Sequence, residues 1–344
     1  MTLDEVRARA RERLKGICNV CPVCDGRACA GRVPGVGGVE TGSSFIDNVR
    51  ALAAVKVNMR VLHDRFRPDT RASLFGRDLS MPVLGAAVAG AALNYGSVLT
   101  EADLAGSMVE GCVREGTVSM TGDGPDMAVL KIGLEAIKAA GGQGIPIIKP
   151  LPNKTIIEKI RVAEDHGVMA VGIDVDAAGF LNMVLAGAPV GPKPLDDLLE
   201  ITASTKLPVI LKGIMTPSDA EIAVRAGAAA IVVSNHGGRA LDHTPGVAWV
   251  LPEIVRVVGG KIAVLADGGV RRGIDVLKYL ALGADAVLVG RPLALGAVGA
   301  RAEGVALTLQ AIRSELVRAM ILTGSGNVGE ITGRVLAQRR LTQQ

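Results

Sequence analysis

Aromatic residues are scarce in this chain of 344 residues, which has four Phe, two Tyr and one Trp. Hydrophobic residues nevertheless make up 49% of the sequence, so the core must be built mainly from Ala, Val, Ile and Leu. Such a core fits a parallel sheet buried on both faces better than a β-sandwich or an aromatic-lined groove. The length allows one large α/β domain or two smaller ones.

Other features are missing as well. No run of 18 uncharged apolar residues occurs, so we expect no membrane span. Residues 1–16 form a charged helical pattern without the apolar stretch of a signal peptide. The net charge of +4 comes from 38 basic and 34 acidic residues in mixed order, which does not indicate nucleic-acid binding. We therefore expect a cytoplasmic protein whose five cysteines are reduced unless they bind a metal.

Eight short apolar runs, each ending in Gly or a polar residue, alternate with helical patterns along the chain. This alternation predicts a (β/α)8 TIM barrel, because the competing doubly wound sheet rarely reaches eight regular strands. We expect a helical, cysteine-containing extension over 1–80 packed on the barrel, the barrel over 81–325, and a polar C-terminal tail over 326–344. The predicted strands are 81–87, 117–122, 145–150, 170–175, 208–213, 230–235, 262–268 and 286–291.

The chemistry of such a barrel lies at the carboxyl ends of its strands. The last two strands end in "ADGGVRRG" and "VGRP", where glycines at the strand ends precede Arg271 and Arg291. Backbone N–H groups and two guanidiniums at one corner predict a phosphate site, although a tight turn with solvent-facing arginines would give the same pattern. Ala86 and Ser234 stand at two other strand ends and are further candidates for cofactor contact.

Three more strand-end residues indicate a reaction centre. Lys212 ends an apolar strand, where an unpaired ammonium is costly to bury, so it either stabilises an anion or forms a Schiff base. His236 is a candidate base near neutral pH, and Arg239 offers a bidentate fork for a carboxylate. The alternative for His236 is a structural role in the loop.

The stretches "LKGIMTPSDAEIAVRAGAAAIVVSNHGGRALDHTPG" and "LADGGVRRGIDVLKYLALGADAVLVGRP" resemble the FMN-dependent α-hydroxy-acid oxidase and dehydrogenase family, the group of lactate and glycolate oxidase. The resemblance runs from about residue 43 to about residue 325 and implies FMN as cofactor, with the ribityl chain near Asp267 and Arg271. It implies that Lys212 stabilises the reduced flavin, that His236 is the base and that Arg239 holds the carboxylate. It also implies a homo-oligomer. The phosphate would be held by Gly268, Gly269, Gly290 and Arg291.

Some positions depart from the family's pattern. Asp176 matches the aspartate that pairs with the catalytic histidine, but the substrate-binding tyrosines are missing. Lys149 stands where the family has a flavin-contacting Gln, and Asp174 replaces a Thr. Opposite charges on neighbouring strands offset one another's burial, so we expect a Lys149–Asp174 pair beside the flavin. Tyr95 is a candidate replacement for one missing hydroxyl.

Four cysteines in the N-terminal extension form a C-x2-C-x2-C-x4-C run, with Cys18, Cys21, Cys24 and Cys29. The spacing is close to that of iron–sulfur ligands, and a structural zinc site would use the same residues. The cysteines would otherwise shape the active-site mouth or act as redox thiols. A cluster would carry electrons away from the flavin and favour a dehydrogenase over an oxidase.

We therefore expect FMN-dependent oxidation of a small, lactate-like L-2-hydroxy acid, with oxygen or another redox acceptor taking the electrons. Two alternatives remain. The first is a non-oxidative FMN isomerase that resembles the type 2 isopentenyl diphosphate isomerases, against which the SNHGGR stretch argues. The second is an aldolase that uses Lys212 as a Schiff base. A non-catalytic flavin-binding scaffold is the residual possibility.

Overall fold

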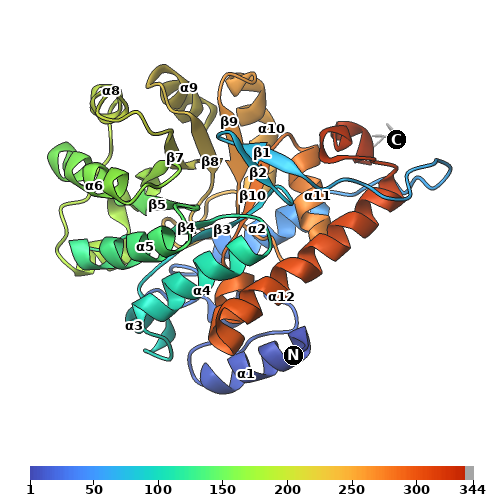
Figure 1. Ribbon diagram of the computed structural model, residues 1–344, viewed down its shortest axis with the longest axis horizontal. Helices are drawn as coiled ribbons and strands as arrows, with labels where there is room; N and C mark the ends of the chain where they lie inside the picture. The colour runs from blue at the N-terminus through green and yellow to red at the C-terminus, as the bar shows by residue number, and fades with distance from the viewer. Residues whose placement is uncertain (338–344) are drawn as a thin grey trace.

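The computed structural model describes residues 1–337. Eight parallel strands close into a barrel in the order β10-β3-β4-β5-β6-β7-β8-β9, which confirms the predicted TIM barrel (Figure 1). The parallel pairs place all carboxyl ends of the strands at one mouth. The strands are β3 (Val83–Val88), β4 (Ser119–Thr121), β5 (Gly144–Ile148), β6 (Val171–Asp174), β7 (Val209–Ile214), β8 (Ala230–Val233), β9 (Ala263–Ala266) and β10 (Ala286–Val289).

Helices follow the strands and cover the outside of the barrel (Figure 1). Thr100, Asp126 and Thr216 cap the helices that follow β3, β4 and β7, each accepting a backbone N–H within the first turn. The last helix has non-helical backbone angles at Ala300 and Arg301, so it consists of two segments. These helices are α4 (Glu101–Arg114), α5 (Met127–Ala139), α6 (Asn153–Asp165), α7 (Leu181–Leu185), α8 (Leu195–Ala203), α9 (Pro217–Arg225), α10 (Val247–Val258), α11 (Gly273–Ala281) and α12 (Arg291–Thr323).

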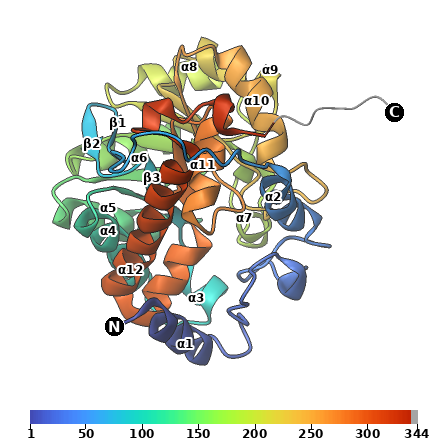
Figure 2. The ribbon, with the colours of Figure 1, turned by 90° about the vertical axis from the view of Figure 1, so that its right-hand side faces the viewer.

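The N-terminal extension reaches both ends of the barrel. Helix α1 (Leu3–Arg13) packs on α12, and the chain then crosses to the carboxyl-end mouth before α2 (Ser43–Ala54) (Figure 2). A hairpin, β1 (Ala72–Leu74) with β2 (Arg77–Leu79), follows and was not predicted from the sequence. Leu74 and Leu79 join the side chains inside the barrel, so the hairpin closes the opposite end. The short helix α3 (Ala91–Tyr95) lies between β3 and α4.

The described part of the C-terminal segment differs from the predicted polar tail. Within 326–337, Ile331 and Val335 are buried against the outer core, and Asn58 N–H donates to the carbonyl of Val335 at 2.8 Å. The remaining predicted tail, 338–344, lies outside the described residues. Within residues 1–337, no helix combines the length and apolar character that crossing a bilayer requires.

Candidate active site

A cavity opens at the carboxyl ends of the strands and holds about 1440 Å³ of empty space, counted out to the solvent at its mouth. Almost all of the site residues predicted on the barrel line it. Asp176 and Ser234 stand behind the lining and contact His236. The predicted residues that line the cavity are Ala86, Lys149, Asp174, Lys212, His236, Arg239, Asp267, Gly268, Gly269, Arg271, Gly290 and Arg291.

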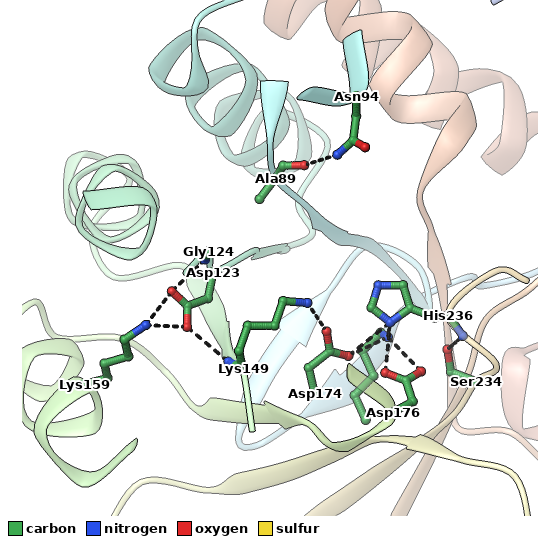
Figure 3. A network of polar contacts seen from close by, with 11 residues as sticks. Ala89, Asn94, Asp123, Gly124, Lys149, Lys159, Asp174, Asp176, Ser234 and His236 are labelled. Carbon is green, nitrogen blue, oxygen red and sulfur yellow. Dashed lines mark hydrogen bonds and ion pairs between the residues drawn. The ribbon is translucent and has the colours of Figure 1, made fainter. Parts of the chain in front are cut away.

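The Lys149 side chain points toward Asp174 on one wall of this cavity (Figure 3). The Asp174 carboxylate accepts from Lys149 Nζ at 2.5 Å and from Lys212 Nζ at 2.9 Å, and all three side chains are buried. The parallel register pairs Asp174 with Lys212 on neighbouring strands, so the contact follows from the sheet itself. Burial alone would raise the pKa of Asp174, but His236, Lys149 and Lys212 hold it well below its usual value. The wall therefore carries one ionised carboxylate and two ammonium groups.

His236 sits on a tight loop after β8, with φ at +59°, a region that few residues other than glycine adopt. The Ser234 hydroxyl accepts the His236 N–H at 3.0 Å and so fixes this turn. The imidazole Nδ1 lies 2.9 Å from Asp176 Oδ1, and the ring stacks on Phe180 with centroids 4.6 Å apart. With Nδ1–H donating to Asp176, the lone pair of Nε2 is the one available to a substrate.

The electrostatic setting favours a neutral imidazole. Burial, followed by the charges of Lys212, Lys149 and Arg239, lowers the pKa of His236 well below 6.5, although Asp174 opposes the shift. Burial also raises the pKa of Asp176 well above its usual value, and the neighbouring charge of Asp174 adds to that. His236 therefore stays ready to accept a proton at neutral and mildly acidic pH.

This setting predicts the pH dependence of the reaction. In the base role predicted for His236 the imidazole must be unprotonated, so kcat/KM would fall as pH drops through the histidine pKa. Because burial lowers this pKa, we expect kcat/KM to stay level from about pH 8 down to pH 6.5 and to fall only below that value. A pH profile of kcat/KM checks this, and an acidic limb centred above pH 6.5 would contradict it.

Arg239 points into the mouth and is held by the N-terminal extension. Its guanidinium donates to the carbonyls of Gly35 and Gly37 and, through Nη2, to Asn94 Oδ1 at 3.1 Å. Asn94 is itself fixed, because its side-chain amide donates to the Ala89 carbonyl at 2.9 Å (Figure 3). These contacts hold Arg239 in a fixed orientation in the wall of the cavity that His236 also lines.

The corner formed by β9 and β10 fits a flavin phosphate and ribityl chain. Gly268 and Gly269 have φ of +84° and +79°, and a Cβ at Gly268 would lie 2.8 Å from Asn48 Oδ1, so only glycine brings the backbone this close. Asp267 Oδ1 is buried and has no partner within the described residues, so a hydroxyl of a bound ribityl chain would satisfy it. The close backbone approach and the unpartnered carboxylate oxygen both fit a bound FMN.

Two arginines add positive charge to this corner. Burial, and then the charges of Arg271 and Arg239, lower the pKa of Arg291 to about 10. Arg291 donates to the carbonyls of Val36 and Gly237, and Arg271 donates to the carbonyl of Cys24, so neither cation is neutralised by these partners. Arg291 at the start of α12 and Arg271 in the loop before α11 place positive charge at this corner, which favours an anion such as a phosphate.

A buried ion pair at the edge of the site was not predicted from the sequence. Lys159 Nζ lies 2.8 Å and 2.7 Å from the two oxygens of Asp123, and Asp123 in turn accepts the Lys149 N–H at 3.1 Å (Figure 3). Both side chains are buried, and the pair fixes the strand end that carries Lys149. The available signal was a lysine on the apolar face of α6, between Ile156 and Ile160.

The four predicted metal ligands do not line this cavity. Cys18, Cys21, Cys24 and Cys29 line a second cavity in the N-terminal extension, and both cavities share Tyr95 and Arg291 in their walls. Tyr95 is buried, and burial raises the pKa of its hydroxyl. The cysteines therefore form a separate site on the far side of these shared residues.

Comparison with known proteins agrees with this geometry. A sequence profile described as FMN-dependent dehydrogenase matches residues 36–183 and 191–338. A 2-hydroxyacid oxidase of Dictyostelium discoideum is 33% identical over 324 residues, covering 85% of this chain and 82% of that protein. Glycolate oxidase 1 of Zea mays is 30% identical, covering 86% and 88%.

Solved structures of mandelate oxidase resemble the whole chain. A complex with 2-hydroxy-phenylacetamide has a TM-score of 0.79 and 33% identity, and the alignment covers 98% of this chain and 97% of that one. Another structure of the same enzyme holds a C4a-OH-FMN adduct, with a TM-score of 0.79. The profile matches most of the chain, including the segments that carry the glycine corner and the His236 loop. The chain therefore belongs to the FMN-dependent dehydrogenase family and is a flavoenzyme that uses FMN.

Proposed function

We propose that the protein oxidises a small, lactate-like L-2-hydroxy acid to the 2-oxo acid. The observation that carries this proposal is the meeting of Arg239, His236 and the flavin corner in one cavity. A carboxylate-binding fork and a base in the same cavity as a redox cofactor suit a substrate whose hydroxyl stands next to its carboxylate. The relatives named 2-hydroxyacid oxidase and glycolate oxidase support the same substrate class.

Each residue has a defined part in this reaction. FMN, when bound, supplies the acceptor for the two electrons that leave the substrate carbon. Arg239 binds the carboxylate and sets the orientation of the substrate. His236 Nε2 takes a proton from the substrate, and Asp176 holds the imidazole through Nδ1. Lys212 lies where a cation would stabilise negative charge on a reduced flavin, and Asp174 holds that ammonium in place.

The lining favours an apolar substituent on the hydroxy acid. Phe180 stacks on the His236 ring, and Leu93 and Met183 line the same cavity. The family's substrate-binding tyrosines are replaced here by residues without hydroxyl groups, such as the buried Leu151. An acid with a methyl or larger alkyl side chain would contact this apolar wall, whereas glycolate would leave it uncovered.

Replacement of Arg239 by methionine tests the carboxylate-binding role. Loss of a charge-assisted hydrogen bond costs about 1.5–3 kcal/mol, so we expect kcat/KM for the hydroxy acid to fall about 10- to 150-fold. The amide of the same acid lacks the negative charge, and its kcat/KM should change far less. Steady-state kinetics with both substrates measure the difference. An equal loss for acid and amide would show that Arg239 does not bind the carboxylate.

The Schiff-base alternative conflicts with the setting of Lys212. Burial alone would lower the pKa of Lys212, but the charges of Asp174, Asp176 and Asp267 outweigh burial and raise it above its usual value. A protonated ammonium has no lone pair with which to attack a carbonyl. The geometry around Lys212 therefore supports charge stabilisation instead of covalent catalysis.

The other sequence-based expectations concern partners and location. Oxygen or another redox acceptor fits an enzyme of this family, and relatives include peroxisomal enzymes of Arabidopsis thaliana. The homo-oligomer and the cytoplasmic location stay predictions. Five unpaired cysteines support a reducing compartment, and the mass of the purified protein by light scattering tests the oligomer.

A further inference from the structure

The strongest feature that the hydroxy-acid chemistry leaves unused is the cysteine run between α1 and α2 (Figure 2). The family profile begins to match at residue 36, so the cysteine run precedes the matched part of the chain. All four cysteines are unpaired and partly buried, and all four line one cavity of about 590 Å³, counted out to its mouth. Four thiols that face one enclosed space form a ligand set.

The spacing of the sulfur atoms separates two kinds of metal site. Tetrahedral zinc with Zn–S bonds near 2.3 Å holds its sulfurs about 3.8 Å apart. Within residues 1–337, no three cysteine sulfurs lie within 4.8 Å of one another. An iron–sulfur cube occupies the space between its ligands and keeps them further apart. The open arrangement therefore suits a cluster better than a single zinc ion.

The surroundings of the cavity also suit a cluster. Its wall includes Ile17, Val20 and Leu295, which would shield a cluster from water. The Arg271 guanidinium lies 3.6 Å from Cys24 Sγ through Nη2, and Arg291 lines the same cavity. N–H groups and positive charge near thiolates offset the negative charge of a cluster and tune its potential. Arg271 and Arg291 also line the flavin cavity, so this charge is shared by the two sites.

We propose that these cysteines bind a [4Fe–4S] cluster beside the flavin site. Val36, Tyr95 and Arg291 form the wall that the two cavities share, so the cluster lies across one layer of side chains from the flavin cavity. The loop that carries the cluster also bears the carbonyls that hold Arg239, which ties the metal site to the active-site mouth. The four ligands are Cys18, Cys21, Cys24 and Cys29.

A cluster in this place provides a second route by which electrons leave the reduced flavin. This consequence rests on the proposed hydroxy-acid oxidation. Oxidation of one hydroxyl to a carbonyl releases two electrons and two protons. The cluster carries one electron at a time, so two single transfers to a one-electron carrier, such as a haem or iron–sulfur protein, balance one oxidation. The two protons leave to solvent, one of them through His236.

Metal analysis of protein purified without oxygen tests the binding site and needs no substrate. We expect about four irons and four acid-labile sulfides per chain, and an absorption shoulder at about 400 nm that remains after the flavin is removed. Cys24→Ala should lose most of the iron, whereas Cys112→Ala should keep it, because Cys112 is buried on α4 and does not line the cavity of the four cysteines. Zinc in place of iron, no metal in the wild type, or full iron in Cys24→Ala would overturn the proposal.

A second measurement on the wild type tests the electron route alone. With hydroxy acid and ferric cytochrome c under air, we expect about two cytochromes reduced for each 2-oxo acid formed, with little hydrogen peroxide. If peroxide matches the 2-oxo acid and no cytochrome is reduced, the route is wrong even where iron is bound. If iron is present and no 2-oxo acid forms, the result supports the proposed cluster and contradicts the proposed substrate class.

Discussion

Replacement of His236 by glutamine is expected to lower kcat by about 10²- to 10⁴-fold, the usual contribution of a positioned base. Glutamine keeps a polar side chain of similar length but cannot take a proton from the substrate. The Asp176 carboxylate that now contacts Nδ1 keeps a possible donor in the glutamine amide, so the loop should stay folded. Single-turnover bleaching of the flavin by the hydroxy acid, followed without oxygen, measures the effect on the chemical step.

His243→Gln is the matched control for this variant. His243 lies on the same loop region, also has positive φ, and its side chain is mostly exposed, with Nε2 4.0 Å from Asp242 Oδ2. It should leave the bleaching rate and the FMN content unchanged. A His236→Gln enzyme with wild-type bleaching would show that another group removes the proton, and equal losses in both variants would point to a structural effect of the loop.

Replacement of Lys159 by methionine is expected to destabilise the protein by about 3–5 kcal/mol, because it leaves Asp123 buried without its counter-charge. Methionine fills a similar volume, so the loss of stability arises from the unpaired charge of Asp123 and not from a cavity. Since Asp123 also holds the Lys149 N–H, the strand end that faces the flavin should loosen as well. Chemical denaturation with saturating FMN measures the free energy of unfolding, and fluorescence titration measures FMN affinity.

Lys154→Met provides the control on the same helix. Lys154 is exposed at the start of α6, so the identical substitution should change stability by less than about 0.5 kcal/mol. The double variant Asp123→Asn with Lys159→Met removes both charges and should recover part of the loss. If Lys159→Met and Lys154→Met have equal effects, the buried pair does not stabilise the barrel.

Sequence reasoning predicted the barrel well because each strand is a short apolar run and each helix has a clear beginning and end. The 117–122 run, for example, contains β4 at Ser119–Thr121. The β1–β2 hairpin was not predicted because its strands have three residues each, too few for a periodic pattern. The described part of the C-terminal segment was expected to be a polar tail. Its two buried side chains, Ile331 and Val335, stand among polar residues and form no apolar pattern in the sequence.

The site was predictable where a residue stands at a strand end. Lys149 and Asp174 were expected to pair across neighbouring strands, and the structure places their charged atoms 2.5 Å apart. Asn94 and Phe180 could not be predicted from the sequence. They lie in segments that follow strands, and only the folding of these segments brings their side chains to Arg239 and His236. The Ser234 hydroxyl accepts the His236 N–H, and the expected contact of Ser234 with the cofactor stays a prediction.

The most direct test is the absorption spectrum of protein purified without oxygen, before and after addition of a small L-2-hydroxy acid such as L-lactate. We expect the oxidised flavin band at about 450 nm, its bleaching by the hydroxy acid, and its return when oxygen or another acceptor is added. Protein without flavin would contradict the cofactor site built on Gly268, Gly269 and Asp267. Flavin that no L-2-hydroxy acid bleaches, across methyl to longer alkyl side chains, would contradict the roles of His236 and Arg239.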